Sequence, residues 1–294
     1  MFIKIGTVEA ALERSKQFSL FFLRRAINSG LFFEQFYSWL PLYKILKILF
    51  PVELSKYEKE INEVAMSYKG SQNDKLIHGV SNPLLRDKLL RQITGDGQGW
   101  GTEAVDLFPN FSLTVQVLMI LLGIKGQSFL RTDVFKISVE WVCNRWKYDL
   151  YEKSGLAFKG AIFLRLLREI VLAGGSIQTL VNQSIIMDTL KHIEKTQTKN
   201  GNWGFFFREF KGVNLDEKLE TPLMASVVCL NLLVSQDIFQ DLYSDNQLEK
   251  MINRSIEYLV RNQHKEGFWV ATSLDDFLKT LGWTIKFLHQ YLKK

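Results

Sequence analysis

A short motif that occurs twice limits what this chain can fold into. The spacing Q-x-x-x-G-x-W occurs at 197–203 and again 66 residues later at 263–269. Its members are Gln197, Gly201 and Trp203 in the first copy, and Gln263, Gly267 and Trp269 in the second. Each copy follows a segment of helical periodicity and precedes another. Self-similarity of this kind predicts a repeat protein built from helical hairpins.

Two weaker copies extend the pattern towards the N-terminus. In one, Gln92 precedes Gly97, Gly99 and Trp100 with altered spacing. In the other, Arg145 and Trp146 stand at the expected end of a helix.

The motif has a structural role in this interpretation. Glycine ends a helix or permits a left-handed turn. We expect the glutamine side chain to satisfy backbone groups at the N-terminus of the next helix, and the tryptophan ring to cover the turn. The motif contains no acid and no nucleophile, so it predicts a fold and not a chemistry.

Helical periodicity predicts an all-α chain with almost no β-alternation. The expected helices are 52–68, 83–93, 112–122, 133–146, 157–172, 177–196, 222–234, 248–262 and 274–291. Hairpins that each bury one face need neighbours, so they form an open solenoid or a closed ring. We predict one domain over 1–294, a single α/α toroid of about five to six hairpins. In it, 1–80 are N-terminal helices and 83–294 carry the repeats.

The segment 18–50 alternates apolar stretches with Arg24, Arg25, Glu34, Lys44 and Lys47. Two or three amphipathic helices that bury one face explain this pattern. A membrane-facing surface is the alternative, because basic residues beside Phe, Trp and Leu suit the headgroup boundary.

Composition excludes several classes of function. The net charge is +6, and basic and acidic residues are interleaved along the chain without a basic cluster, which argues against binding of nucleic acid. Two cysteines, Cys143 and Cys229, form no disulfide framework and no metal-ligand spacing with the four histidines. The N-terminus has acidic residues where a signal peptide needs an apolar run, so a cytoplasmic location is expected.

The repeated turn resembles the QW repeats of squalene–hopene cyclases and related class II terpene cyclases, over about Pro83 to Lys294. The resemblance implies an α/α barrel, shared with protein prenyltransferase β subunits, and an aromatic-lined cavity. It also implies cyclisation of a hydrophobic isoprenoid, begun by protonating an alkene or epoxide. Such chemistry needs a carboxyl kept protonated in an apolar site and ring faces that hold a carbocation.

In that family the acid is the central Asp of a D-x-D-D motif, which this sequence lacks. After the first turn, N-L-D-E at 214–217 keeps a carboxylate at the third position. We take Asp216 as the expected acid, with Glu217 or Glu220 assisting its hydrogen bonding. Capping and the helix dipole are the alternative explanation for acids near a helix start.

After the second turn, S-L-D-D at 273–276 offers Asp275 and Asp276 as further candidates. Ser273 as a helix N-cap, followed by first-turn acids, explains the same residues without catalysis.

The chain contains 22 Phe, which fill a core or line a cavity for a hydrophobic or cationic guest. Phe205, Phe206 and Phe207 are the expected wall residues. We expect no metal and no cofactor, since no zinc-ligand set and no D-D-x-x-D magnesium motif is present. Paired carboxylates of an α/α-barrel glycosidase, Asp216 with Asp275, remain open.

The large cyclases carry two toroids, whereas this chain has length for one. A pocket within the ring, a partner chain or a homodimer would complete a cavity. The alternative function is a non-catalytic toroid that binds a hydrophobic ligand or a partner protein.

Overall fold

The computed structural model describes residues 4–67, 93–94, 96–101, 109–152, 156–203, 245–271 and 273–293, and at 37, 65–67, 245–246 and 275–276 it describes the backbone alone. Within these ranges the chain forms α-helices and no strand, so the expected all-α class is confirmed. An isolated antiparallel bridge joins Gln197 and Trp203. The chain divides into two compact units. The closed toroid concerns both units together and stays a prediction.

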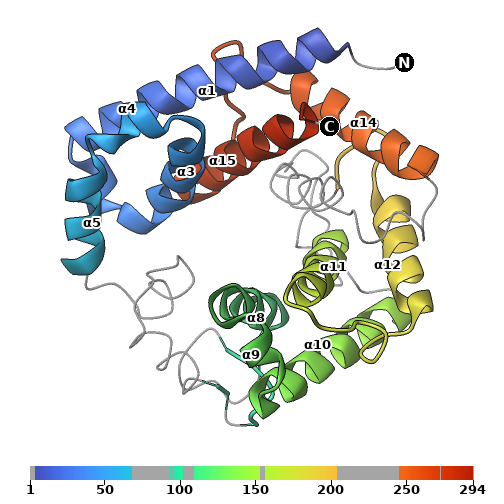
Figure 1. Ribbon diagram of the computed structural model, residues 1–294. Coiled ribbons are helices and arrows are strands. Elements are labelled where there is room, and N and C mark those ends of the chain that lie inside the picture. The colour runs from blue at the N-terminus through green and yellow to red at the C-terminus, as the bar shows by residue number, and fades with distance from the viewer. Residues whose placement is uncertain are drawn as a thin grey trace. The chain divides into compact units, whose positions relative to one another are not determined.

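The first unit contains both ends of the chain, with residues 1–69, 197–235 and 245–294. Its described helices are α1 (Ile5–Asn28), α2 (Leu31–Glu34), α3 (Phe36–Leu49), α4 (Pro51–Ser55), α5 (Glu58–Ser67), α14 (Asp245–Arg261) and α15 (Leu274–Tyr291). Helix α1 contacts both α14 and α15, and these helices lie side by side in Figure 1. The first and last helices of the chain therefore share one core.

Helices α3 and α15 pack closely, and a glycine lies at their contact. A Cβ atom added at Gly282 of α15 would lie 3.4 Å from the Leu42 Cα and 3.1 Å from the Ile45 Cδ1 of α3. Leu42 and Ile285 are fully buried beside this contact. Close approach of two backbones over a small residue brings more apolar atoms into van der Waals contact.

The second unit comprises residues 70–196 and 236–244. Its described helices are α8 (Phe111–Lys125), α9 (Gln127–Leu130), α10 (Asp133–Tyr151), α11 (Ala157–Leu172) and α12 (Gln183–Thr196). Helix α11 packs against both α8 and α12, and ten of its sixteen residues are buried. It is therefore the central helix of this unit.

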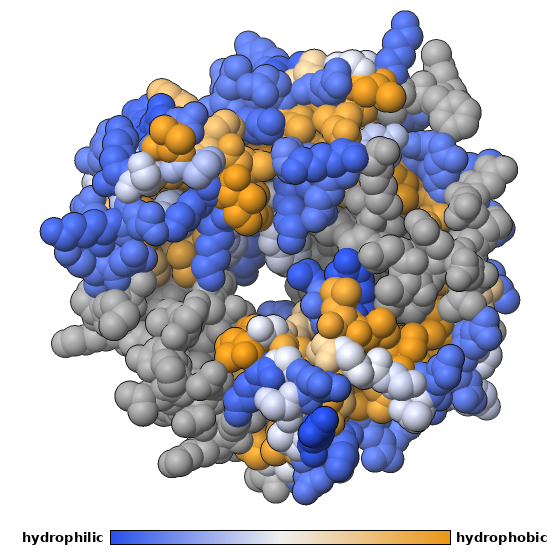
Figure 2. All heavy atoms as spheres, in the orientation of Figure 1, coloured by the Kyte–Doolittle hydropathy of each residue, from blue (hydrophilic) through white to orange (hydrophobic). Residues whose placement is uncertain are grey.

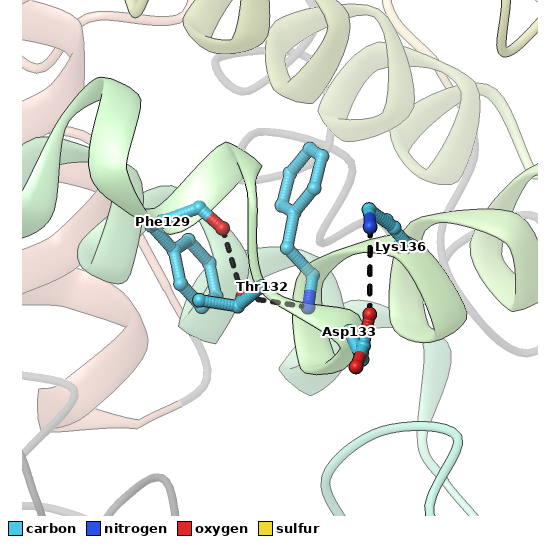
Figure 3. Close-up of polar contacts among 5 residues, drawn as sticks. Phe129, Thr132, Asp133 and Lys136 are labelled. Carbon is cyan, nitrogen blue, oxygen red and sulfur yellow. Dashed lines mark hydrogen bonds and ion pairs between the residues drawn. The ribbon is translucent and has the colours of Figure 1, made fainter.

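Helix α10 begins with a side-chain cap (Figure 3). The Phe135 N–H donates to the Thr132 Oγ1 at 3.2 Å, and the Thr132 hydroxyl donates to the Phe129 carbonyl at 2.8 Å. Asp133 in the first turn pairs with Lys136 at 3.4 Å. Threonine at this position satisfies an N–H that has no partner within the helix, and an acid in the first turn suits the helix dipole.

Some helix boundaries differ from those expected. The helix expected at 133–146 continues to Tyr151, and the one expected from 177 begins at Gln183. The expected helix 52–68 is broken at Lys56 and Tyr57 into α4 and α5. The segment 18–50 forms the end of α1 followed by α2 and α3, as expected for amphipathic helices.

None of the helices in the described ranges is both long enough and apolar enough to span a membrane. Several large apolar side chains of the first unit are nevertheless exposed, among them Phe21, Ile48 and Val52. Figure 2 shows hydrophobic residues at the surface among hydrophilic ones.

Candidate functional site

Most of the expected reacting residues lie outside the described residues. These are the acids Asp216, Glu217 and Glu220 and the wall residues Phe205, Phe206 and Phe207. Their roles stay predictions.

Asp275 and Asp276 lie in the first turn of α15, where the backbone alone is described. Ser273 directly precedes this helix, and its carbonyl accepts from the Phe277 N–H at 2.9 Å. This agrees with the interpretation of Ser273 as the N-cap residue.

The first glutamine turn follows α12 and docks on α14. The two N–H groups of the Gln197 Nε2 are shared among three acceptors, the Met251 carbonyl at 2.9 Å, the Ser255 Oγ at 2.8 Å and the Gly201 carbonyl at 3.1 Å. The Ser255 hydroxyl also donates to the Gly201 carbonyl. Trp203 is fully buried and closes the turn through its bridge with Gln197. One amide group therefore ties the turn to itself and to a helix 54 residues further along.

Gly201 is required in this turn for two reasons. Its φ is +93°, a left-handed conformation that side chains with a Cβ rarely adopt. A Cβ atom there would also overlap the Arg254 carbonyl oxygen of α14. The glycine permits both the turn and its close contact with the neighbouring helix.

The second glutamine turn follows α14 and docks on α1 in the same way. The Gln263 Nε2 donates to the Ala11 carbonyl at 2.8 Å and to the Ser15 Oγ at 2.7 Å. Gly267 has φ of +98°, and a Cβ atom there would overlap the Arg14 carbonyl oxygen. The buried Trp269 donates from Nε1 to the Leu259 carbonyl of α14 at 2.7 Å.

These contacts correct the expected role of the glutamine. Among the described residues its amide nitrogen contacts no N-terminus of a following helix; it donates to a carbonyl and a hydroxyl within the body of a neighbouring helix. The reason is chemical, since an NH₂ group has two donors and such a carbonyl keeps a free lone pair. Both tryptophans are buried.

The third copy keeps the turn but loses its glutamine. The Thr94 N–H donates to the Gly99 carbonyl at 2.7 Å, and the Gly97 N–H donates to the Thr94 carbonyl at 2.8 Å. The same two backbone bonds close the intact turns. Those turns have one residue fewer than the third copy between the first glycine and the tryptophan. This register puts Ile93 at the glutamine position, so the alignment through Gln92 is corrected.

A threonine of α8 ties down the third turn. The Trp100 N–H donates to the Thr114 Oγ1 at 3.0 Å, and the Thr114 hydroxyl donates back to the Trp100 carbonyl at 3.2 Å. A Cβ atom at Gly99 would lie 2.6 Å from the Thr114 Oγ1. One side chain of the following helix therefore holds both backbone groups of Trp100.

The fourth copy is not a turn. Trp146 lies inside α10, which continues to Tyr151. Its Nε1 donates to the Thr189 Oγ1 of α12 at 2.8 Å, and its ring packs against Gly160 of α11. It is a buried residue that joins three helices of the second unit.

The described phenylalanines form both a core and a partly exposed cluster. Phe32, Phe36, Phe129, Phe163 and Phe287 are fully buried.

Four others are half-buried and meet where α1, α15 and the second turn come together; we call Phe18, Phe22, Phe268 and Phe277 the phenylalanine cluster. The Phe18 ring centroid lies 5.0 Å from that of Phe268, and Phe22 lies 5.7 Å from Phe277. The cluster continues inward, since Phe22 lies 5.0 Å from the buried Trp39. Phe277 follows Asp275 by two residues in α15, so the cluster adjoins the helical turn that carries Asp275 and Asp276.

Sequence reasoning did not identify Asp149, a buried acid of the second unit. The Asp149 Oδ1 lies 3.2 Å from the Arg145 Nη2, and its Oδ2 lies 3.9 Å from the Lys159 Nζ. Its side chain is 3% exposed. A buried carboxylate beside two basic side chains suits a structural ion pair.

The other reactive groups that the structure describes form no second centre. Among the described residues no three His, Cys, Asp or Glu side chains are grouped as metal ligands would be. Burial raises the pKa of the Cys143 thiol to about 12, so this cysteine is protonated at neutral pH.

No protein-family model matches this sequence, and no curated protein matches it. Function is therefore inferred from the turns, the phenylalanine cluster and the acidic segments.

Proposed function

We propose that this protein is a terpenoid cyclase of class II type. It binds a prenyl or polyprenyl chain and starts cyclisation by transferring a proton to an alkene or an epoxide. The observation that carries the proposal is the pair of Gln–Gly–Trp turns, which share one backbone conformation and one mode of docking. Two turns that agree in this detail make a chance match to the QW spacing a poor explanation.

The phenylalanine cluster supports an apolar substrate. Half-buried aromatic rings cost free energy when they face water, and a hydrocarbon chain laid against them removes that cost. Ring faces also attract a cation within about 6 Å, which suits a carbocation as the double bonds close. In the proposed reaction Phe22 and Phe277 contact the chain near the point where the charge first forms.

Two acidic segments compete for the role of proton donor. Asp216 keeps the third position of N-L-D-E, and Asp275 keeps the third position of S-L-D-D. Residues two apart in a helix lie on different faces, so the closeness of Asp275 to Phe277 in the sequence does not favour it over Asp216. In either case the carboxylic acid loses its proton to the substrate and recovers it when the final cation releases one.

The test is product formation from geranyl, farnesyl and geranylgeranyl diphosphates and from squalene. Wild type is compared with Asp216→Asn and Asp275→Asn, and Glu13→Gln on the exposed face of α1 is the matched control. Loss of the true acid lowers the rate by about 10²–10⁴-fold, and the control keeps the wild-type rate. Equal product from wild type and Asp216→Asn removes Asp216 from the mechanism, and the same outcome for Asp275→Asn removes Asp275.

A second function rests on the acidic segments themselves. Neither has the complete D-x-D-D, which favours a protein that binds a hydrophobic ligand or a partner without reacting. In that case apolar chains quench or shift tryptophan fluorescence, while no substrate gives a product. Absence of both binding and product would contradict the two functions together.

The proposed location is the cytoplasm, with peripheral contact to a membrane through the N-terminal helices. Exposed Phe21, Ile48 and Val52 supply the apolar contacts. Sedimentation with lipid vesicles tests this, and Ile48→Ser with Val52→Ser is expected to weaken it.

A further inference from the structure

Helices that receive a neighbouring segment carry a hydroxyl at a fixed distance from their own motif residue. Ser255 of α14 stands eight residues before Gln263, and Thr189 of α12 stands eight residues before Gln197. Both hydroxyls accept a hydrogen bond from a side-chain nitrogen of another segment. Each of these two helices is therefore contacted in its middle by another segment, and the glutamine after its end contacts a further helix.

Three hydroxyls each accept a hydrogen bond from a side-chain nitrogen of another segment. The Ser255 Oγ accepts from the Gln197 Nε2 at 2.8 Å, and the Ser15 Oγ accepts from the Gln263 Nε2 at 2.7 Å. The Thr189 Oγ1 accepts from an indole instead of an amide, at 2.8 Å. In α1 and α12 the receiving hydroxyl in turn donates to the carbonyl four residues earlier, at 2.9 Å and 2.6 Å. The side-chain hydroxyl orients towards the incoming nitrogen because its own proton is held by the helix.

A fourth position lacks the incoming nitrogen. Ser138 of α10 stands eight residues before Trp146, and its buried Oγ has no hydrogen-bond partner among the described residues. The turn nearest in sequence before α10 has Ile93 where the intact turns have glutamine. A receiving hydroxyl without a partner thus occurs in the unit whose turn lacks its amide.

Helix α1 differs from α12 and α14 because it accepts a hydrogen bond from a motif residue but is not itself followed by one at this spacing. The position eight residues after Ser15 is Leu23, inside a helix that continues to Asn28. The second glutamine turn contacts α1 at Ser15, and Gln263 lies 248 residues after this serine.

We propose that Ala11, Arg14 and Ser15 of α1 form a receptor site for the second glutamine turn, and that this contact is a clamp between α1 and that turn. The Gln263 amide donates to Ala11 and Ser15, while the Arg14 Nη2 donates back to the Gln263 Oε1 at 2.6 Å. Helix α15 begins five residues after Trp269, so the clamp holds α1 and orients the start of α15 at the same time. It does not depend on the cyclase proposal.

Hydrogen–deuterium exchange of the full-length protein tests the clamp. Gln263→Ala is compared with Gln197→Ala, which breaks the equivalent contact on α14. We expect Gln263→Ala to speed exchange of amides near Ser15 and at the start of α15 by about tenfold, with amides of α10 unchanged. Gln197→Ala is expected to act on α14 instead.

A double variant separates the clamp from general loss of stability. If Gln263 and Ser15 belong to one clamp, Gln263→Ala speeds exchange in α1 less in the Ser15→Ala background than in wild type, because one of its three contacts is already lost there. Multiplying effects of the two changes would overturn the proposal, as would equal acceleration of α1 and α10 by Gln263→Ala. Glu13→Gln, one helical position from the site, is the control for folding.

Discussion

The two glutamine turns have the same backbone and different surroundings. Both have a glycine with φ between +93° and +98° and both dock on an Arg–Ser pair in the middle of a helix. Gln197 is buried, whereas Gln263 is partly exposed. The glycine and the amide nitrogen therefore have the same role in both turns, while the surroundings of the amide oxygen differ.

The arginine of each pair shows this adaptation. Arg14 donates to the Gln263 Oε1, but Arg254 donates from Nε to the Lys250 carbonyl at 3.4 Å. The buried Gln197 Oε1 has no hydrogen-bond partner in the part of the chain that the structure describes. The more buried turn is therefore held through the amide nitrogen and not through the amide oxygen.

The largest expected effect comes from the turn glycines. Gly201→Ala and Gly267→Ala each force a Cβ into a carbonyl of the docking helix and keep a left-handed φ. Strain and overpacking together predict a loss of roughly 3–5 kcal/mol in the free energy of unfolding. Chemical denaturation measures this loss for each variant.

Gly30→Ala is the matched control, because Gly30 has φ of +81° and no atom within 4 Å of the position of a Cβ. Only backbone strain acts there, so we expect a loss of about 1–2 kcal/mol. Equal losses at all three glycines would show that the close contact with the docking helix contributes nothing.

The glutamines separate the turns by burial. Gln197→Ala removes buried bonds to Met251 and Ser255, where water does not replace the amide, and is expected to cost about 2–3 kcal/mol. Gln263→Ala opens a partly exposed site that water enters, so we expect about 1 kcal/mol. The same denaturation experiment gives both values, and a larger loss for Gln263→Ala would reverse the ranking by burial.

The arginines give a smaller difference. Arg14→Ala removes an exposed hydrogen bond to Gln263, for which we expect about 0.5 kcal/mol. Since Gln263 is neutral, added salt is expected to change this value little. Arg254→Ala leaves the first turn unchanged, because Arg254 bonds within its own helix. Equal losses from the two arginine variants would show that the Arg14 bond does not stabilise the second turn.

Sequence periodicity was enough for the all-α class and for the two intact turns. Gly201 and Gly267 have the left-handed conformation that a helix-ending glycine predicts. The spacing of glutamine, glycine and tryptophan encodes a local conformation, and local conformations are what a short motif specifies best.

The partners of the glutamines could not be predicted in this way. The glutamine amide donates to the Met251 carbonyl in one turn and to the Ala11 carbonyl in the other. The partner depends on which helix lies beside the turn and not on the motif. Trp146 was wrongly placed at a helix end, because α10 continues to Tyr151 and the partner of Trp146 is Thr189 of another helix. The Arg–Ser pair that receives both turns is visible in the sequence once its role is known.

The smallest expected effect tests whether breaking the second turn stays local. Cys143 of α10 is buried and its pKa is raised to about 12, so in the native state its thiol reacts very slowly with a disulfide reagent at pH 8. With Cys229→Ser as background, we expect Gln263→Ala to leave the labelling rate of Cys143 within about twofold of its parent, because α10 belongs to the second unit and makes no part of the clamp. Labelling that rises in parallel with hydrogen exchange in α1 would mean that both units open in one cooperative step. The contrast between the two turns would then be one of global stability and not of local environment.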